Sequence, residues 1–237
     1  MEIPNIFPDC SSCSSRFQSV FSALTKDEIS MIDEHKSCVE VKKSETLFSQ
    51  GARPHGLFCV RKGKLKVIRT GSEGKEQIVH LAKNGDIMGY RAILGNDNYS
   101  CSGIAIENSR LCFIPQRIFI SLVENNAKLA LQLMRLFSEE LREAEKSIAD
   151  IAQKPVRERL AQSLLLLKGT YGFEKDESTL NIKTTREDIA AISGTTRETA
   201  TRMLRDFNEE KIIELKGKKI KILDNQKLLR AANIFDR

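Results

Sequence analysis

The stretch TTREDIAAISGTTRETATRMLRDF, Thr184–Phe207, decides the fold of the C-terminal part of this 237-residue chain. Thr184 and Thr185 are each followed three residues later by an acidic residue, and either pair can form a capping box at the start of a helix. Gly194 stands where a helix end favours a left-handed residue, and Thr196 can cap the helix that follows. The stretch therefore predicts two short helices joined by a tight glycine turn.

The second of these helices has two different faces at about 100° per residue. Its apolar side consists of Ala200, Met203, Leu204 and Phe207, and its polar side of Arg197, Glu198, Thr201, Arg202 and Arg205. An arginine can donate two hydrogen bonds to guanine, and a carboxylate can accept one from the cytosine amino group. The polar side therefore suits base edges in a DNA major groove, although a solvated surface helix would show the same charges.

The segment after this helix favours the DNA interpretation. Apolar and basic residues alternate from Lys211 to Ile222 around a Lys-Gly-Lys turn, which predicts a β-hairpin. A helix-turn-helix followed directly by a basic hairpin is typical of a winged helix, whose lysines can contact phosphates. The predicted DNA-binding residues are Arg186, Thr196, Arg197, Glu198, Thr201, Arg202, Lys218 and Lys219.

Composition sets only broad limits. Hydrophobic residues make up 41% of the chain, and its formal net charge is +6, with most of that excess after Pro155. This modest excess is compatible with nucleic acid as a partner but does not require it. The sequence contains no run of 18 apolar residues and no secretory signal, so we expect a cytoplasmic protein with no membrane partner. Its six cysteines are then expected to be reduced thiols or metal ligands rather than a disulfide framework.

Residues 1–25 are predicted to be an N-terminal arm with a Cys10-Ser-Ser-Cys13 motif. Two cysteines at this spacing can reach one metal or form one disulfide, but they are only half of a metal site. A Ser-rich arm with incidental thiols is the alternative. A thioredoxin-like enzyme would place the motif in a βαβ unit, and the sequence predicts none after it. Thr25 and Glu28 form a further capping box, which predicts a short helix through Ile32.

Residues 26–115 are predicted to form a β-roll or jelly roll after that helix. Short apolar runs of period two alternate with glycine-marked turns from residue 36 onward. Residues 57–60 and 65–68 flank one turn, and the loop 70–75 leads to the run 77–81, so two hairpins are expected. Such a roll can enclose a small ligand or be filled by its own side chains, and the periodicity does not distinguish these cases.

Residues 116–153 are predicted to form a long dimerisation helix. The spacing 3, 4, 3, 4, 3 connects an apolar seam of Met134, Phe137, Leu141, Ala144, Ile148 and Ile151. The seam can pack on the protein's own domain, but its strict period of about 3.5 residues and the needs of a palindromic DNA site favour a parallel homodimer. Pro155 is predicted to end this helix at a hinge. Residues 154–237 are predicted to form the winged helix-turn-helix domain. The predicted fold class is α+β.

The order of arm, β-roll, long helix and winged helix, together with TRETATR at residues 196–202, resembles the CRP/FNR family of bacterial transcription regulators. The resemblance extends over nearly the whole chain and includes Gly51 and the Gly63 turn. It implies that Arg197, Glu198 and Arg202 read base pairs in a palindromic half-site that contains G·C. It also implies double-stranded DNA as a partner, and RNA polymerase if the protein is an activator.

Two positions depart from the members of that family that bind cyclic nucleotides. Those members hold the ribose with a glutamate and the cyclic phosphate with an Arg-Ser pair. The corresponding residues here are Tyr90-Arg91 and Tyr99-Ser100, so the ribose carboxylate and the phosphate guanidinium are both missing. We therefore expect that cyclic AMP is not the ligand.

The oxygen-sensing members of the family bind an iron–sulfur cluster through three N-terminal cysteines and one near the end of the roll. Cys10 and Cys13 look like the first two ligands and Cys112 like the last, whereas the third position holds Ser19. Cys38, Cys59 and Cys101 do not match the pattern. The resemblance thus offers an iron–sulfur cluster as the candidate cofactor, with an incomplete ligand set.

The leading hypothesis is a DNA-binding regulator that acts as a homodimer and is switched by an effector or redox signal sensed in its N-terminal part. A thiol redox enzyme or metal carrier that uses Cys10 and Cys13 is a second hypothesis. A protein-interaction module with a vestigial helix-turn-helix is a third.

Overall fold

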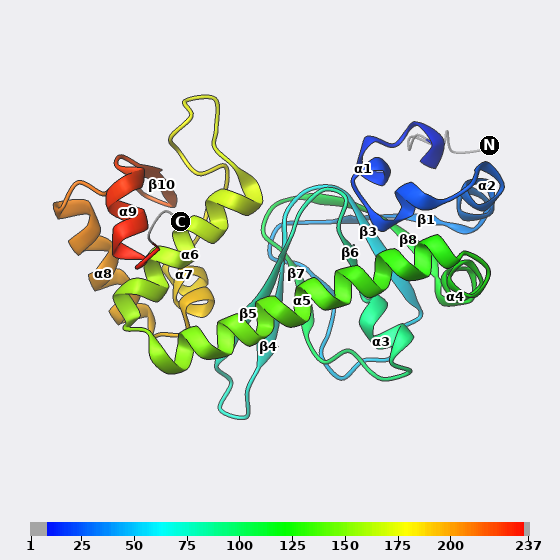
Figure 1. Cartoon of the computed structure of the whole chain (residues 1–237), viewed down its shortest axis with the longest axis horizontal. Coiled ribbons are helices and arrows are strands. Elements are labelled where there is room, and N and C mark those ends of the chain that lie inside the picture. The colour runs from blue at the N-terminus through cyan, green and yellow to red at the C-terminus, as the bar shows by residue number, and fades with distance from the viewer. Residues whose placement is uncertain (1–8, 235–237) are drawn as a thin grey trace. The chain divides into compact units, whose positions relative to one another are not determined.

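The computed structural model describes residues 9–234 and contains two compact units (Figure 1). The first comprises the chain up to Thr70 together with His80–Leu141, and the second comprises Gly71–Val79 and the chain from Arg142 onward. The long helix α5 (Ala127–Gln153) contributes residues to both.

The N-terminal arm folds into three short helical segments before α2 (Lys26–His35). They are η1 (Cys10–Ser12), α1 (Ser14–Phe17) and η2 (Val20–Ala23). The predicted capping box begins α2, because the Thr25 hydroxyl accepts from the backbone N–H of Glu28 while the Glu28 carboxylate accepts from the backbone N–H of Thr25 at 2.7 Å. The helix is confirmed and continues to His35, beyond its predicted end at Ile32.

Two four-stranded sheets form a β-sandwich, which confirms the predicted roll. Their strand orders are β1-β8-β3-β6 and β2-β7-β4-β5. The strands are β1 (Ser37–Val41), β2 (Thr46–Phe48), β3 (Gly56–Lys62), β4 (Leu65–Thr70), β5 (Glu76–Ala82), β6 (Ile87–Met88), β7 (Ser102–Ala105) and β8 (Ser109–Pro115), with helix α3 (Tyr90–Leu94) after β6.

One of the two predicted hairpins is wrong. Strands β3 and β4 are consecutive in sequence, but they belong to different sheets, so the turn at residues 61–64 carries the chain from one sheet to the other. Gly63 is required there, because its φ is 132° and a Cβ would lie 2.1 Å from the Ser109 hydroxyl. The hairpin across residues 70–75 is confirmed, since β4 and β5 are neighbours.

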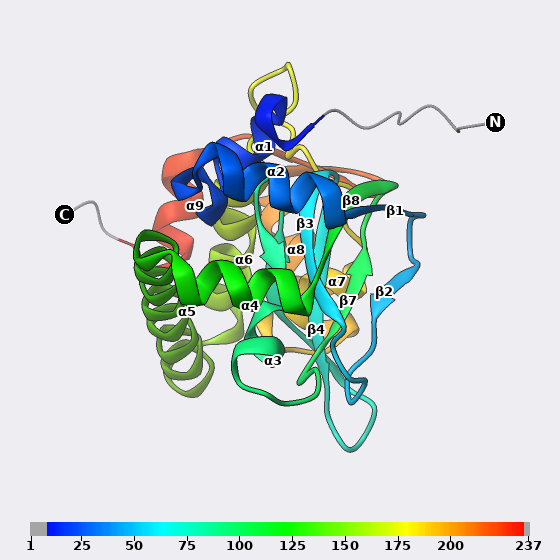
Figure 2. The same ribbon diagram turned by 90° about the vertical axis from the view of Figure 1, so that its right-hand side faces the viewer.

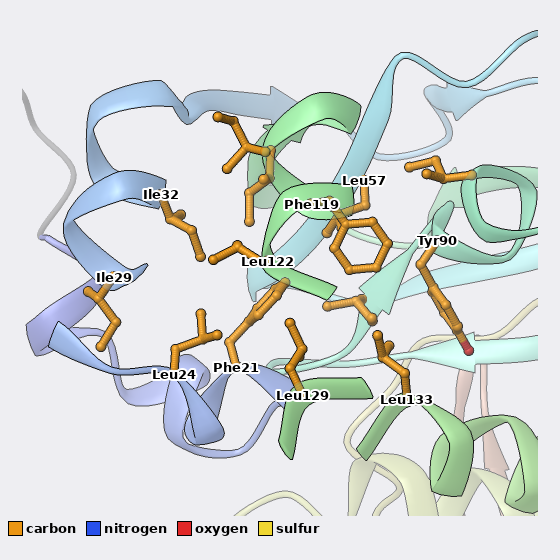
Figure 3. Packing of buried hydrophobic residues seen from close by; sticks show 14 residues of the cluster. Phe21, Leu24, Ile29, Ile32, Leu57, Tyr90, Phe119, Leu122, Leu129 and Leu133 are labelled. Atoms are coloured by element: carbon orange, nitrogen blue, oxygen red, sulfur yellow. The ribbon is translucent and has the colours of Figure 1, made fainter. Parts of the chain in front are cut away.

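Alternation along β3 and β8 gives the first sheet two buried faces. Val60 and Leu111 pack in the core that also contains Leu65 and Met88. Neighbouring positions point to the opposite face, where α2, α4 and the arm cover the sheet (Figure 2). Figure 3 shows the side chains of this second core, which consists of Phe21, Leu24, Ile29, Ile32, Leu57, Ile87, Tyr90, Ile93, Ile114, Ile118, Phe119, Leu122, Leu129 and Leu133.

The segment predicted as one long helix contains two. Helix α4 (Gln116–Asn125) ends at Asn126, whose backbone is extended, and α5 begins at Ala127. The Asn126 side-chain oxygen accepts a hydrogen bond from the backbone N–H of Leu129 at 2.9 Å, as an N-cap residue does. Its side-chain amide donates to both carboxylate oxygens of Glu28, at 3.0 and 2.9 Å. The same carboxylate therefore takes part in the capping of α2 and holds the start of α5.

Most of the predicted seam on α5 is exposed in the single chain. The exposed fraction is 61% for Met134 and Leu141, 69% for Ile148 and 45% for Ile151, and Ala144 is also exposed. Phe137 differs, because its ring lies 5.3 Å from the Tyr90 ring and packs against the second core. The seam therefore leaves the core of the first unit after Phe137.

The second unit contains the predicted helix-turn-helix and hairpin. Its elements are α6 (Val156–Tyr171), α7 (Arg186–Ser193), α8 (Arg197–Glu209), β9 (Ile213–Lys216), β10 (Lys219–Ile222) and α9 (Asn225–Ala231). The apolar stripe of α6, formed by Leu160, Leu164 and Leu167, is fully buried against this core. Between residues 9 and 234, no helix combines the length and the apolar composition needed to cross a membrane.

Candidate DNA interface and cysteine cavity

The turn between α7 and α8 is fixed by the local signals that the sequence contains. Thr185, rather than Thr184, caps α7, and its capping box with Asp188 is complete, with hydrogen bonds of 2.9 to 3.0 Å. Gly194 ends α7 in the left-handed conformation at φ 63°. Thr196 caps α8 by accepting a hydrogen bond from the backbone N–H of Thr199 at 3.3 Å.

The polar face of α8 carries the predicted base-reading residues. Arg197, Glu198 and Arg202 are exposed, and Ala200, Leu204 and Phe207 are buried on the opposite side. The Arg197 side chain is 64% exposed and forms an ion pair of 2.7 Å with Glu187 of α7. An exposed pair of this kind contributes at most about 1 kcal/mol, so Arg197 can exchange it for a base edge at small cost.

Two further predicted DNA-binding residues, Thr201 and Arg186, interact with other groups of the protein. The Thr201 hydroxyl donates to the backbone carbonyl of Arg197 at 2.7 Å, so one of its hydrogen-bonding functions is used within the helix. Arg186 at the start of α7 is half-buried, and burial followed by the nearby positive charge of Arg205 lowers the pKa of its guanidinium. A phosphate between these two arginines would relieve their repulsion.

The two wing lysines differ in their surroundings. Gly217 has φ 61° and forms the hairpin turn with Lys218, which is exposed. Lys219 forms an ion pair of 2.7 Å with Glu174 in the loop after α6. Of these two lysines, Lys218 is the one exposed to solvent. Lys219 instead connects the hairpin to the loop after α6 through its ion pair with Glu174.

Arg159 of α6 is a residue that sequence reasoning missed. Its guanidinium donates to the backbone carbonyls of Ser193 at 2.9 Å and Gly194 at 3.2 Å, in the helix-turn-helix turn. It also donates to those of Ile151 at 3.0 Å and Lys154 at 2.8 Å, at the end of α5. An arginine in a charged helical segment gives no sequence signal for such contacts, because all its partners are backbone oxygens brought near by the fold.

Four cysteines border one small cavity in the first unit. Cys10 and Cys13 come from the arm, Cys59 from β3 and Cys112 from β8, and the cavity has a volume of about 40 Å³. Cys112 lies directly opposite Cys59 in the ladder of β3 and β8, and directly opposite Cys38 in the ladder of β1 and β8. Opposite residues of an antiparallel pair point to the same face, so the three strand cysteines form a row.

The arm closes this cavity through polar contacts. The Ser15 hydroxyl donates to the backbone carbonyl of Arg61 at 2.7 Å, and the backbone N–H of Cys10 donates to the Asp33 carboxylate at 2.9 Å. Lys36 forms an ion pair with Asp33 and donates to the Cys10 sulfur at 3.2 Å. The ammonium group of Lys36 therefore lies beside the Cys10 thiol.

Burial favours the protonated form of the Cys10, Cys59 and Cys112 thiols. It raises the pKa of Cys10 to about 12 and that of Cys112 to about 11. The pKa of Cys59 is raised as well, by burial first and then by the neighbouring Cys112, Cys10 and Cys13. Within residues 9–234, no three His, Cys, Asp or Glu side chains gather closely enough to hold a single metal ion.

The positions expected to differ from a cyclic-nucleotide site make contacts within the protein. The Tyr90 hydroxyl donates to the Glu140 carboxylate of α5 at 2.5 Å, and Arg91 forms an ion pair of 2.6 Å with the same carboxylate. Tyr99 stacks on Phe48 with ring centroids 4.4 Å apart. A Cβ at Gly103 would lie 2.7 Å from the Phe48 ring, so the aromatic side chains fill this part of the sandwich.

Two domain models match the chain, and a known regulator matches it over nearly its whole length. A cyclic nucleotide-binding domain matches residues 38–126 and a Crp-like helix-turn-helix domain matches residues 158–231. The fumarate and nitrate reduction regulatory protein of Vibrio cholerae is 32% identical over 231 residues, which cover 95% of this chain and 90% of that protein. The chain belongs to the CRP/FNR family of transcription regulators.

Other members of the CRP/FNR family are similarly related. Electron transport regulator A of Shewanella oneidensis is 33% identical over 225 residues, covering 92% of this chain and 88% of that protein. The crystal structure of a crp/fnr family regulator from Eubacterium rectale has a TM-score of 0.74 at 24% identity, covering 90% of this chain and 97% of that one. FixK2 from Bradyrhizobium japonicum also reaches 0.74, at 20% identity, with coverage of 83% and 96%. These structures share the fold.

This CRP/FNR-family regulator binds DNA through its helix-turn-helix and is not an enzyme, so the hypothesis of a thiol redox enzyme is wrong. The recognition helix α8 lies within the matched residues 158–231. Cys59 and Cys112 lie within the matched residues 38–126, whereas Cys10 and Cys13 precede them. The arm cysteines therefore lie outside the residues that match the cyclic nucleotide-binding domain.

Proposed function

We propose that this regulator binds a palindromic DNA site as a homodimer and is switched by a signal sensed in its N-terminal part. The observation that carries the proposal is the exposed polar face of α8, where Arg197, Glu198 and Arg202 lie opposite the buried apolar side of the helix. Such a helix can enter a major groove without uncovering its core. Arg197 and Arg202 donate to guanine, and Glu198 accepts from cytosine, so each half-site contains G·C pairs.

Sequence-independent contacts come from the residues around that helix. Thr196 at the start of α8, Arg186 at the start of α7 and Lys218 at the wing turn reach phosphates. Thr201, half-exposed on α8, contributes to the base-reading face. Lys219 contributes after it exchanges the Glu174 carboxylate for a phosphate. These contacts fix the register of the helix on the duplex and make the affinity depend on salt.

The homodimer forms through the seam of α5. Met134, Leu141 and Ile148 are large apolar side chains that are more than half exposed in the single chain, with Ala144 and Ile151 on the same face. Phe137 lies where the seam meets the core of the first unit. A parallel pairing of two α5 helices buries these side chains and provides the two recognition helices that a palindrome requires.

The switch is a two-state change that alters how the recognition helices are presented. Arg159 connects the end of α5 to the turn between α7 and α8, so a change at the α5 seam reaches the DNA-binding surface through backbone contacts. If the protein activates transcription, RNA polymerase is a further partner.

The signal is sensed at the cysteine cavity rather than at a cyclic-nucleotide site. The side chains of Tyr90 and Arg91 both bind the Glu140 carboxylate. Neither of them therefore replaces the glutamate that holds the ribose in the cyclic-nucleotide-binding members. Cys10, Cys13 and Cys112 border one cavity and have the soft sulfur ligands that an iron–sulfur cluster requires. When bound, such a cluster supplies redox chemistry, and the arm residues hold it against the sheet.

Selection of binding sites from random duplex DNA tests the core of this proposal. We expect a two-fold symmetric consensus with G·C pairs in each half and half-site centres about 10 base pairs apart, or a multiple of that spacing. Footprinting on the selected site should show protection of both halves. A consensus with a single unrepeated half-site, occupied by one chain, would contradict it.

A further inference from the structure

The ligand set of Cys10, Cys13 and Cys112 lacks a fourth thiolate. Ser19, which stands at the third position of the N-terminal pattern, has a hydroxyl that already has a structural role. It donates to the backbone carbonyl of Arg16 at 2.8 Å and accepts from the backbone N–H of Phe21 at 3.1 Å, where it caps η2. A neutral hydroxyl engaged in this way is a poor substitute for a soft sulfur ligand.

Cys59 supplies a sulfur on the opposite wall of the same cavity. It lies directly across from Cys112 in the ladder of β3 and β8, on the face that the arm covers. Cys10, Cys13, Cys59 and Cys112 all border the cavity, two from the arm and two from the sheet. Cys38 is also directly opposite Cys112, but it does not border the cavity. Both Cys38 and Cys59 lie opposite Cys112, so strand register alone does not distinguish them. Cys59 is the one of the two that also borders the cavity.

The charges around the cavity suit a set of thiolates. Arg16 and Arg61 border it, and Lys36 donates to the Cys10 sulfur. Positive side chains offset the negative charge that accumulates when several thiols lose their protons. The cavity of about 40 Å³ is smaller than a cluster, so binding of one would require the arm to move outward. Contacts such as that of Ser15 with the Arg61 carbonyl are single hydrogen bonds that such a movement can replace.

We propose that Cys59 is the fourth protein ligand of an iron–sulfur cluster that Cys10, Cys13 and Cys112 also bind, in the place that Ser19 leaves open. The inference rests on the cysteine site of the proposed function. Each of the four thiols releases its proton to solvent and forms one bond from its sulfur to iron, with no change in the oxidation state of the sulfur. The site thus takes its ligands as two pairs, one from the arm and one from neighbouring strands.

Anaerobic reconstitution of the full chain with ferrous iron, sulfide and a thiol reductant tests this proposal. The readouts are bound iron and sulfide per chain, the visible absorption spectrum and the electron paramagnetic resonance spectrum after reduction. The variants are Cys59→Ala, the matched control Cys38→Ala, Ser19→Ala, and Ser19→Cys combined with Cys59→Ala. We expect Cys59→Ala to lose most of its iron and sulfide, whereas Cys38→Ala and Ser19→Ala retain the wild-type content.

The combined variant keeps the test decisive if Cys59→Ala weakens folding. A cysteine at position 19 should restore a cluster to the Cys59→Ala chain, with an altered spectrum because one ligand has moved. Retention of the wild-type cluster by Cys59→Ala would overturn the inference, and so would its loss in Ser19→Ala alone. If the wild-type chain itself takes up no iron, the cysteine site of the proposed function fails with it, while site-specific DNA binding, measured in parallel by gel shift, tests the remainder separately.

Discussion

The Arg159 guanidinium donates from its Nε to the backbone carbonyl of Ser193 at 2.9 Å and from a terminal nitrogen to that of Ile151 at 3.0 Å. Ser193 ends the first helix of the helix-turn-helix, and Ile151 lies in the last turn of α5. One side chain therefore joins the helix that carries the seam to the turn that sets the direction of the recognition helix.

Replacement of Arg159 should affect both stability and DNA binding. Arg159→Ala is expected to lower the free energy of unfolding by about 2 kcal/mol, because hydrogen bonds from a charged donor contribute about 1.5–3 kcal/mol. Arg159→Lys should rescue little, since an ammonium cannot reproduce the planar fork. Urea denaturation measures the stability and fluorescence anisotropy the affinity. Arg157→Ala, which removes a surface ion pair with Glu210 and the stacking of the guanidinium over the Phe207 ring at 4.6 Å, is the control and should cost less than Arg159→Ala. Equal losses would contradict the special role of Arg159.

Arg202 and Lys218 should have different effects on DNA recognition. Arg202→Ala is expected to weaken binding to the selected site by about 1–3 kcal/mol and to relax the preference at one base pair. Lys218→Ala should weaken specific and non-specific DNA alike, and should reduce the slope of log affinity against log salt by about one. Gel shifts with matched and mutated sites across a salt series measure both effects, and each variant serves as the control for the other. If Arg202→Ala weakened binding to matched and mutated sites equally, Arg202 would contact a phosphate rather than a base.

The α5 seam should determine the oligomeric state. Leu141→Glu together with Ile148→Glu places two charges on the exposed apolar face and is expected to give monomers in sedimentation velocity. Lys146→Glu is the control, because it changes the net charge by the same amount on the opposite side of the helix. Unchanged dimers in the double variant would show that another surface mediates association.

Tyr90 should act as a structural residue and not as a ligand contact. Tyr90→Phe removes a hydrogen bond to the Glu140 carboxylate and is expected to lower the free energy of unfolding by about 1.5–3 kcal/mol. Tyr99→Phe is the control, because its hydroxyl reaches the Gly56 carbonyl only at 3.4 Å and should matter less. Isothermal titration of cyclic AMP into the wild-type protein should show no binding at micromolar concentrations. Micromolar or tighter binding would overturn the assignment.

Features determined by neighbours in sequence could be predicted. The left-handed Gly194, the helix end before Pro155 and a capping box at the start of α7 each depend on a few adjacent residues, although the sequence did not decide between Thr184 and Thr185 as the cap. The winged helix and the sandwich followed from these signals and from the alternation of apolar residues. The break at Asn126 was missed, and one of its contacts, the hydrogen bond to Glu28, joins residues nearly a hundred positions apart.

Features determined by register and long-range contacts could not be predicted. The placement of Cys59 opposite Cys112 depends on which strands are neighbours, and the sequence suggested a hairpin of β3 with β4 that does not form. The ion pair of Lys219 with Glu174 and the four backbone acceptors of Arg159 likewise depend on the tertiary fold. A sequence pattern identifies a basic residue but not the carbonyl that it meets.

The Glu28 carboxylate connects the starts of two helices in the first unit, α2 and α5. It accepts from the backbone of Thr25 at the start of α2 and from the side chain of Asn126 at the start of α5. The Glu28 carboxylate thus joins the first turn of α2 to Asn126, which caps the helix that carries the seam. Loss of this carboxylate would therefore remove hydrogen bonds from the starts of both helices at once.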